Sequence, residues 1–520
     1  MAEASSSATQ FYTVYPTNPN NAIEVAETQK FLDSIDDDVL ENRNSEGLIS
    51  WRVSLEDEAS LERLKEHSGI RIVELEGSPL GQRSTETRRD EEKDEYQLFW
   101  ILWAKDPDDT DVNKKIGDWL KTRTIDKGKT LLNSSSENGG VEFWAADLDE
   151  GDIEEAKKQP GVEFVYKDVL TEEDRYMPDH EELQVHGSGD TSMAKRETLR
   201  WTVQAGVPDW GLRDISRPKD LGAKDPGEMS DFVHEERAGE GVRVYVIDRG
   251  VELHVKDEHG VEIFSNIDDN DVISTVLNVG QSGGKLSDSS PGGHGTKVAS
   301  KALSSRFGVA KNAKLIPVKI NPGATGVIAG LDAIIKDLNA PGHAGYKDKA
   351  VVVCARSTPP NANPAPELSV KFTQKLGKLF KLGVPVVWSA GNKAKETGRR
   401  MVDSLPAKLT SPTLPLIVVG ASTFGGNRAD FSQSGDKVTI LAPGEGVFVH
   451  DKSDGDFKHD IQGTSFAAPT VAGIIATYMN YDPPPWGAAD LKGKQRVKAI
   501  RDYMPKRNSA WKRNNKDFVI

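Results

Sequence analysis

The 520-residue sequence is almost devoid of cysteine, with Cys354 as its only one. A single cysteine cannot form a disulfide within the chain or build a zinc site from several thiolates, and we expect Cys354 to be a small buried core residue. Long apolar runs are also missing, since no stretch approaches the ~18 apolar residues that a membrane span requires. The N-terminus lacks a basic stretch followed by an apolar run. These absences predict an intracellular protein with no membrane partner.

Basic residues are in deficit as well. The chain contains 66 Lys and Arg against 81 Asp and Glu, which gives a formal net charge of −15 at pH 7. An acidic protein repels phosphate backbones, so nucleic acid is not an expected partner. The length corresponds to two to four folded units of ~100–200 residues each.

The N-terminal part of the sequence contains the same pattern twice. A strand rich in aromatic residues, an amphipathic helix, a second strand, an acidic helix start and a final strand follow one another, and this order then recurs. The register holds, because Leu148 lies 93 residues after Leu55 and Gly161 lies 92 residues after Gly69. We predict two small α+β units of the split β-α-β, ferredoxin-like kind, at residues 9–75 and 95–170.

The rest of the chain predicts linkers and one larger domain. Polar, charge-dense stretches predict a linker at 76–94, a flexible linker at 171–200 and a basic tail at 509–520. Between them, at 201–508, β-branched runs alternate with helix-like stretches. This alternation is typical of an α/β domain with a mostly parallel sheet.

Three polar residues stand where α/β sheets place their sites. Asp248 ends a strand-like run, His294 opens a predicted helix after two glycines, and Asn392 follows Gly391 at the end of another strand-like run. Each residue alone has a structural explanation, as a turn or cap residue or as a packed histidine. The functional interpretation of Asn392 is a side-chain donor to a developing oxyanion.

The strongest signal is the segment 463–473, with the sequence GTSFAAPTVAG. Ser465 falls at the N-terminus of a predicted helix of small residues, with Pro469 expected in its first turn. Small side chains let such a helix pack closely, and its N-terminus stabilises negative charge. Serine is a weak nucleophile near neutral pH and needs a base within hydrogen-bond reach, for which His294 is the candidate.

The order Asp248, His294, Asn392, Ser465 and the segments around these residues resemble the signature blocks of the subtilisin-like serine peptidases, the subtilases. Supporting blocks also match at 307–310 (FGVA), 429–432 (ADFS) and 441–444 (LAPG). The resemblance covers roughly Trp210 to Tyr503. It implies a subtilisin-like, doubly wound, mostly parallel sheet and a hydrolase that cleaves protein or peptide substrates through an acyl-enzyme.

The resemblance also implies roles for individual residues. Ser465 is then the nucleophile, His294 the base, and Asp248 the carboxylate that orients the imidazole. Asn392 and the backbone N–H of Ser465 bind the oxyanion. The candidate substrate-binding residues are Arg356, Ser389, Ala390 and Gly391.

The two repeated units resemble the inhibitory prodomain of subtilases, 95–170 more closely than 9–75. In the family this domain assists folding and lays its C-terminal tail in the cleft. The resemblance therefore implies a zymogen that its own N-terminal units hold latent. The other interpretation is that the units are structural or partner-binding modules, and for 9–75 both interpretations stay open.

Three departures from the family pattern concern the site. Arg249 follows Asp248 where the family has Thr or Ser, and it could pair with the carboxylate or point to solvent. Arg356 lies in a segment where the family usually has Asn, a small pair and then Ser-Leu-Gly, and it puts charge and bulk on an edge that normally receives substrate. The segment 318–326 is shorter than the family's substrate-pairing edge strand.

These departures motivate a second hypothesis, a catalytically degenerate subtilase that acts as a binding or scaffold protein. A third is a ligase or cyclase that uses the same acyl-enzyme. Two acidic clusters, at 106–111 and 268–271, could bind calcium, which many subtilases use. Neither cluster has the spacing of a known loop motif. We therefore expect solvated charge there and no cofactor or metal.

Overall fold

The computed structural model describes residues 10–16, 22–35, 39–44, 47–55, 60–61, 63–64, 67, 70–75, 98–136, 139–173, 201–216, 230–276, 286–362, 364–487 and 490–506. The predicted linker at 76–94 and the basic tail at 509–520 lie outside these residues, as does most of the predicted linker at 171–200. The helices are α1 (Ala22–Leu32), α3 (Thr110–Arg123), α4 (Glu150–Ala156), α5 (Trp210–Ile215), α6 (His294–Leu303), α7 (Ala324–Asn339), α8 (Pro366–Lys381), α9 (Thr464–Tyr478) and α10 (Gly493–Tyr503).

The strands of the two N-terminal units are β1 (Gln10–Pro16), β2 (Leu40–Asn44), β3 (Gly47–Leu55), β4 (Ile70–Leu75), β5 (Trp100–Ala104), β6 (Leu131–Ser135), β7 (Val141–Ala146), β8 (Val162–Lys167) and β9 (Glu172–Glu173). The remaining strands are β10 (Trp201–Gln204), β11 (Phe232–Glu235), β12 (Arg243–Asp248), β13 (Ile273–Ser274), β14 (Lys314–Lys319), β15 (Ala350–Cys354), β16 (Arg356–Ser357), β17 (Val386–Ser389), β18 (Ile417–Ser422), β19 (Ile440–Pro443), β20 (Val447–His450) and β21 (Phe457–Ile461).

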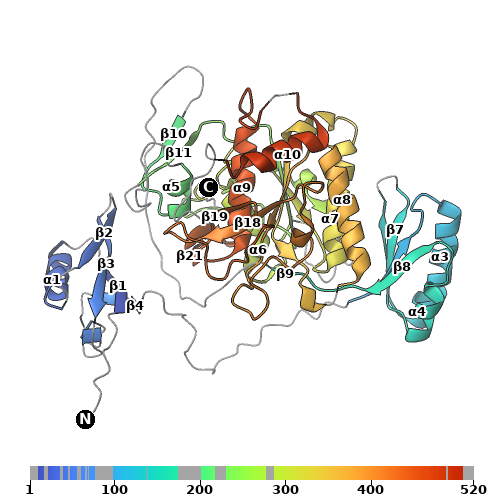
Figure 1. Ribbon diagram of the computed structural model, residues 1–520, viewed down its shortest axis with the longest axis horizontal. Helices are drawn as coiled ribbons and strands as arrows, with labels where there is room; N and C mark the ends of the chain where they lie inside the picture. The colour runs from blue at the N-terminus through green and yellow to red at the C-terminus, as the bar shows by residue number, and fades with distance from the viewer. Residues whose placement is uncertain are drawn as a thin grey trace, which may run out of the picture.

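A seven-stranded sheet in the order β13-β14-β12-β15-β17-β18-β19 forms the centre of the larger domain, and every neighbouring pair is parallel. Residues of the central strands alternate between two hydrophobic clusters: in β12, Val244 and Val246 join one cluster, and Tyr245 and Ile247 join the other. Helices α6 and α9 pack on the first face, and α7 and α8 pack on the second (Figure 1). The predicted doubly wound α/β fold is thereby confirmed.

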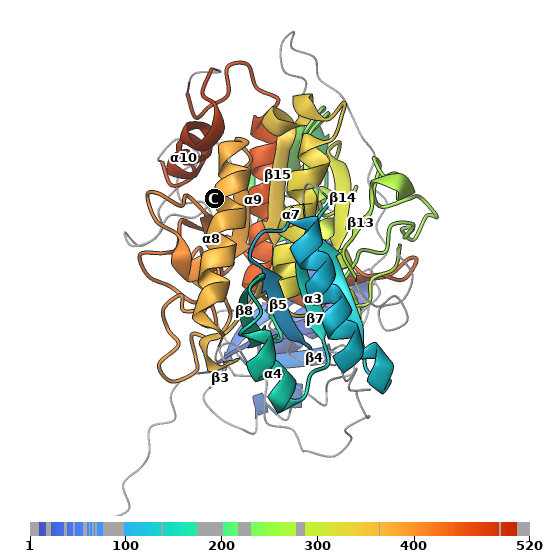
Figure 2. The same cartoon turned by 90° about the vertical axis from the view of Figure 1, so that its right-hand side faces the viewer.

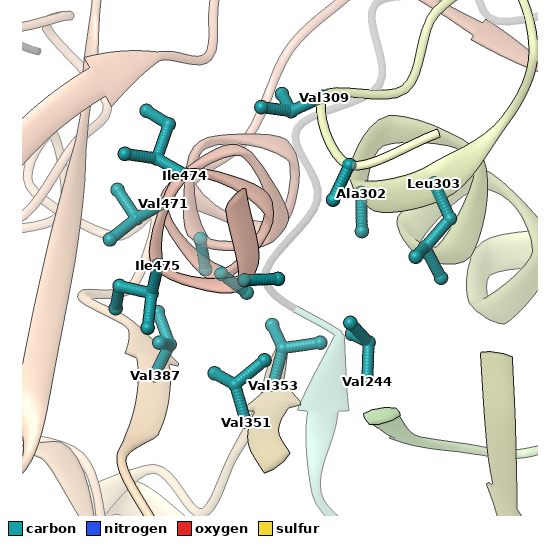
Figure 3. Packing of buried hydrophobic residues seen from close by; sticks show 14 of the residues in the cluster. Val244, Ala302, Leu303, Val309, Val351, Val353, Val387, Val471, Ile474 and Ile475 are labelled. Carbon is teal, nitrogen blue, oxygen red and sulfur yellow. The ribbon is translucent and has the colours of Figure 1, made fainter. Parts of the chain in front are cut away.

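Helix α9 is the apolar centre of the first face. Figure 3 shows Ile475 of this helix close to Val387 and Val351 of the sheet. On its other side, a Cβ added at Gly473 would lie 2.7 Å from the Cβ of Val309, so the glycine lets α9 approach α6 and the segment that follows it. Pro469 stands in the second turn of α9 rather than in the predicted first turn, and its ring nitrogen cannot donate to the carbonyl four residues earlier.

The two N-terminal units share one topology. The sheet order is β2-β3-β1-β4 in unit one (residues 10–75) and β6-β7-β5-β8 in unit two (residues 98–173), which correspond strand for strand. In unit one Val14 lies opposite Trp51, and in unit two Leu102 lies opposite Trp144. All four side chains are buried in clusters that include the helix of their own unit. The repeat in the sequence therefore encodes a repeated fold.

Unit two packs against the larger domain over α7 and α8, with α3 and α4 turned away from it (Figure 2). The sheet residues that face the larger domain share one hydrophobic cluster with α7 and α8; they are Phe99, Ile101, Trp103, Phe143, Ala145 and Tyr166. Ion pairs surround this contact: Lys375 Nζ of α8 lies 2.9 Å from Glu142 and 2.6 Å from Asp332, and all three side chains are buried. Because a buried charge is costly unless it is paired, this network favours one docked arrangement.

Candidate active site

The carboxyl end of β12 and the first turn of α6 bring two of the predicted residues into contact. His294 Nδ1 lies 2.7 Å from Asp248 Oδ2, and both side chains are fully buried. A Cβ added at Gly295 would lie 2.0 Å from the carbonyl oxygen of Gly250, so glycine is what lets α6 approach the strand end. An ionised carboxylate only accepts hydrogen bonds. Nδ1 therefore carries the hydrogen, and the lone pair of the imidazole is on Nε2.

The N-terminus of α9 positions Ser465 and Asn392 through a shared neighbour. Asn392 Oδ1 accepts hydrogen bonds of 2.9 Å from both the backbone N–H and the hydroxyl of Thr464, so the amide is fixed and its Nδ2 is turned away. Within the described part of the chain, Asn392 Nδ2 and Ser465 Oγ are buried without a hydrogen-bond partner. The ring of Phe466, the residue after Ser465, lies 6.2 Å from the His294 ring. A buried donor without a partner is costly, which is the situation a bound oxyanion would relieve.

The predicted substrate-binding residues divide into two groups. Ser389 ends β17, and Ala390 and Gly391 follow it. All three are buried and precede Asn392, and Gly391 has a φ of 102° that glycine adopts readily. The fourth, Arg356, does not present its charge at an open edge. Its side chain is 3% exposed and its Nη1 lies 3.3 Å from Asp248 Oδ1, so its charge is directed at the carboxylate instead of the open edge where we expected it. Cys354 is fully buried, as predicted.

Arg356 takes the role that the sequence suggests for the side chain of Arg249. The backbone N–H of Arg249 donates to Asp248 Oδ1 at 2.8 Å, whereas the guanidinium beside the carboxylate is that of Arg356. Burial opposes the ionisation of Asp248, but the His294 ring and the Arg356 guanidinium hold the pKa of this carboxyl below its usual range. Asp248 is therefore a fixed negative charge next to the imidazole.

The end of unit two, residues 168–173, is called the tail here, and it lies between two edges of the larger domain. On one edge, Thr171 N–H donates to Pro322 O at 2.9 Å and Ala324 N–H donates to Val169 O at 2.8 Å. On the other edge, β9 pairs antiparallel with β16. The short segment 318–326 thus still pairs with an extended chain, and the structured part of unit two continues three residues beyond its predicted end at 170.

Asp168 anchors the tail at the N-terminus of α7. Its carboxylate accepts hydrogen bonds from Thr325 N–H at 3.2 Å and from Thr325 Oγ1 at 2.9 Å. A Cβ added at Gly323 would lie 2.1 Å from this carboxylate, so only glycine leaves room for it. Burial raises the pKa of Asp168 to about 6, although the hydrogen bonds from Thr325 and Val169 act in the opposite direction.

We expect the docking of unit two to depend on pH through Asp168. The docked carboxyl binds its proton more tightly than an undocked one, so docking is most stable below about pH 4 and loses up to about 3 kcal/mol as the pH rises through 6. The urea concentration that releases unit two, followed by the fluorescence of the buried Trp103, should fall between pH 5 and pH 8. Asp168→Asn should remove this dependence, and an equal fall in the Asn variant would contradict it.

The acidic clusters at 106–111 and 268–271 bond within their own turns and to neighbouring side chains, so their charge is not simply solvated: Asp269 pairs with His254, and Asp271 pairs with Arg243 and Lys314. Asp106 Oδ1 accepts from the N–H of Asp108, and Asp268 Oδ1 accepts from the N–H and the side-chain amide of Asn270. Among the residues that the structure describes, no three His, Cys, Asp or Glu side chains gather in a way that could hold a metal ion. Among the same described residues, no helix is long and apolar enough to cross a membrane.

Sequence reasoning missed Asp168 and Thr171 as parts of this site, and it missed the contact of Arg356 with Asp248. One feature of the sequence could have indicated Asp168: it directly follows the predicted last strand of a unit that resembles an inhibitory domain. Thr171 lies in a polar stretch that reads as linker. The contacts of Thr171 and Arg356 join segments that are more than a hundred residues apart, and local patterns carry no information about them.

Comparison with known proteins gives one family. The model of the subtilase family (Peptidase_S8) matches residues 239–512. The subtilisin-like serine protease Pen ch 13 of Penicillium rubens is 28% identical over 366 residues, which are 69% of this chain and 74% of that protein. Subtilisin-like protease 1 of Trichophyton verrucosum is 27% identical over 393 residues, 73% of this chain and 82% of that protein. A solved structure of a cold adapted subtilisin-like serine proteinase covers 61% of this chain and 98% of its own, at 23% identity and a TM-score of 0.44. The chain belongs to the subtilase family and is a serine endopeptidase of the subtilase type.

Proposed function

We propose that this endopeptidase cleaves peptide bonds of protein substrates through Ser465, His294 and Asp248. Ser465 Oγ attacks the carbonyl carbon and passes its proton to His294 Nε2, which then gives it to the leaving amine. Asp248 orients the imidazole and stabilises its charged form. Water then releases the acyl group from Ser465 by the same route. The observation that carries the proposal is the buried 2.7 Å contact of His294 Nδ1 with Asp248 Oδ2.

Asn392 is the proposed donor to the oxyanion, together with the backbone N–H of Ser465. Its Oδ1 is held by two hydrogen bonds from Thr464, so its Nδ2 keeps one direction before substrate arrives. A donor that is already oriented in a buried site needs no reorganisation when charge develops on the substrate oxygen.

Unit two is the proposed inhibitor of the same site. The tail fills the space between the segment 320–324 and β16, where an extended substrate would form the same backbone hydrogen bonds. The large apolar contact with α7 and α8 supports this position. While the tail is in place, substrate is excluded and the enzyme is latent.

A second candidate, a binding or scaffold protein without peptidase activity, has one observation in its favour. Arg356 is an additional cation on the carboxylate that is meant to support the imidazolium. A fluorophosphonate probe separates the two candidates, because only an activated serine reacts with it.

We expect the probe to attach to Ser465 of the wild-type chain after unit two has been released at high pH in mild urea. His294→Ala should slow the labelling at least a hundredfold, because the base is lost. His450→Ala replaces another buried histidine, on β20, and is the matched control. A folded wild-type chain that is labelled no faster than His294→Ala would support the binding-protein candidate.

A further inference from the structure

A single guanidinium connects the proposed catalytic carboxylate to the tail. Arg356 is in β16, the strand that pairs with β9. Its Nη1 lies 3.3 Å from Asp248 Oδ1, and its Nε donates to Thr171 Oγ1 at 3.2 Å. With 3% of its side chain exposed, the guanidinium interacts with the charge of Asp248 in a medium of low dielectric constant. It therefore acts on the site far more strongly than a surface arginine would.

The two oxygens of Asp248 have different partners. Oδ2 faces His294 Nδ1, whereas Oδ1 accepts from the Arg249 backbone N–H and from Arg356. The negative charge of Asp248 is thus divided between an imidazole that gains a positive charge during the reaction and a guanidinium that always carries one. A permanent cation beyond the carboxylate makes protonation of the imidazole less favourable.

Other charged groups around His294 belong to three further segments. Asp288 precedes α6 and accepts from the Thr296 N–H at 2.7 Å, and both its own burial and the charge of Asp248 raise its pKa. Lys297 of α6 pairs with Asp451 at 3.6 Å. Helix α9 contributes the uncharged Phe466 ring. Asp288 and Lys297 thus have partners other than Asp248, whereas Arg356 contacts this carboxylate directly.

We propose that Arg356 is a positioning residue that lowers the basicity of His294 by sharing Asp248 with it, while Thr171 of the tail holds the other side of its guanidinium. The inference rests on the proposed function, because it assigns an effect on the base of that reaction. It implies that this enzyme keeps His294 neutral, and so able to accept the serine proton, to a lower pH than it would without Arg356. The tail contact makes Arg356 the residue through which unit two touches the triad.

Nuclear magnetic resonance of the full chain tests the proposal without requiring activity. In a Ser465→Ala background, which prevents cleavage, the Nδ1–H proton of His294 is followed against pH, and its assignment comes from the loss of the signal in His294→Ala. Arg356→Met keeps the volume of the side chain and removes its charge. Arg356→Gln is a second neutral variant that can still hydrogen-bond. Arg356→Lys keeps the charge without the planar fork and is the matched control.

We expect the midpoint of His294 protonation to rise by about one pH unit in both neutral variants, because a nearby buried cation is removed. In Arg356→Lys the midpoint should stay close to that of the arginine chain. The proposal would be overturned if His294 had the same protonation midpoint in the neutral variants as in the chain with Arg356. It would also be overturned if the midpoint in Arg356→Lys rose as far as in the neutral variants. If Arg356→Met does not fold, Arg356→Gln gives the same comparison.

The result of this titration can be told apart from the result of the test of peptidase activity. Peptide cleavage without any shift in the neutral variants rejects the role of Arg356 and leaves the peptidase intact. A shift of the expected size, found while the chain that retains Ser465 neither reacts with the fluorophosphonate nor cleaves peptides, rejects the proposed peptidase mechanism and leaves the effect of Arg356 on His294 standing.

Discussion

The Ser465→Ala chain is expected to hydrolyse peptide substrates at least about a thousandfold more slowly than the wild-type chain. The reason is that alanine has no group to form the acyl-enzyme, while the contact of His294 with Asp248 remains in place. The substitution removes one buried oxygen without a hydrogen-bond partner in the described structure, so folding should be unaffected. Peptide products quantified by mass spectrometry measure the loss.

Intact mass gives a second readout of the same change. If the wild-type chain loses about its N-terminal third and Ser465→Ala stays at 56.8 kDa, the chain processes itself through this serine. Ser453→Ala, at an exposed serine in the turn between β20 and β21, should behave as the wild type does. Equal hydrolysis by the wild-type and Ser465→Ala chains would place the activity elsewhere.

Trp103→Ala is expected to release unit two from the larger domain. Trp103 is fully buried on the face of β5 that meets α7 and α8, and Lys371 Nζ lies 4.3 Å above its ring. Removing a buried aromatic side chain costs about 3–5 kcal/mol, which raises the undocked population by at least about a hundredfold. The unit itself should stay folded, because its own core is the separate cluster around Leu102 and Trp144.

Hydrogen exchange measures this release at single amides. The N–H groups of Thr171 and Ala324 bond across the contact, to Pro322 O and Val169 O, so both should exchange about a hundredfold faster in Trp103→Ala. Trp119→Ala removes the same kind of side chain from α3, on the far side of the unit, and is the matched control. Unchanged exchange at Thr171 and Ala324 would show that the aromatic contact does not hold the tail.

The sequence was most informative where local patterns and chain order suffice. Strand β15 (350–354) is one of the β-branched runs of the predicted α/β domain, and such a run, apolar on both faces, is typical of a strand buried in a parallel sheet. His294 and Asp248 meet because parallel strands direct the segments after them to one edge of the sheet. The repeat was also visible in the local pattern, because the same residue types recur at a constant spacing. Trp144 lies 93 residues after Trp51, as Leu148 does after Leu55, and both tryptophans are buried.

Other features depend on which distant segments meet. The direction of the Arg356 side chain follows from Asp248, 108 residues earlier, and from Thr171, 185 residues earlier. No periodicity in the sequence encodes such contacts. The sequence did not indicate strand β9 because Glu172 and Glu173 are polar, and their extended conformation comes from pairing with β16 rather than from their own preferences.

The route of the chain through the tail has a consequence for how the enzyme responds to dilution. Unit two and the larger domain are joined through the segment between Glu173 and Trp201. In the proposed inhibition, the tail competes with substrate at an effective concentration in the millimolar range for as long as this connection is intact, whatever the enzyme concentration. A cut in that segment turns the tail into a separate molecule that obeys mass action. Concentrated enzyme would then remain inhibited by its own fragment, whereas enzyme diluted below the dissociation constant of the fragment would become active.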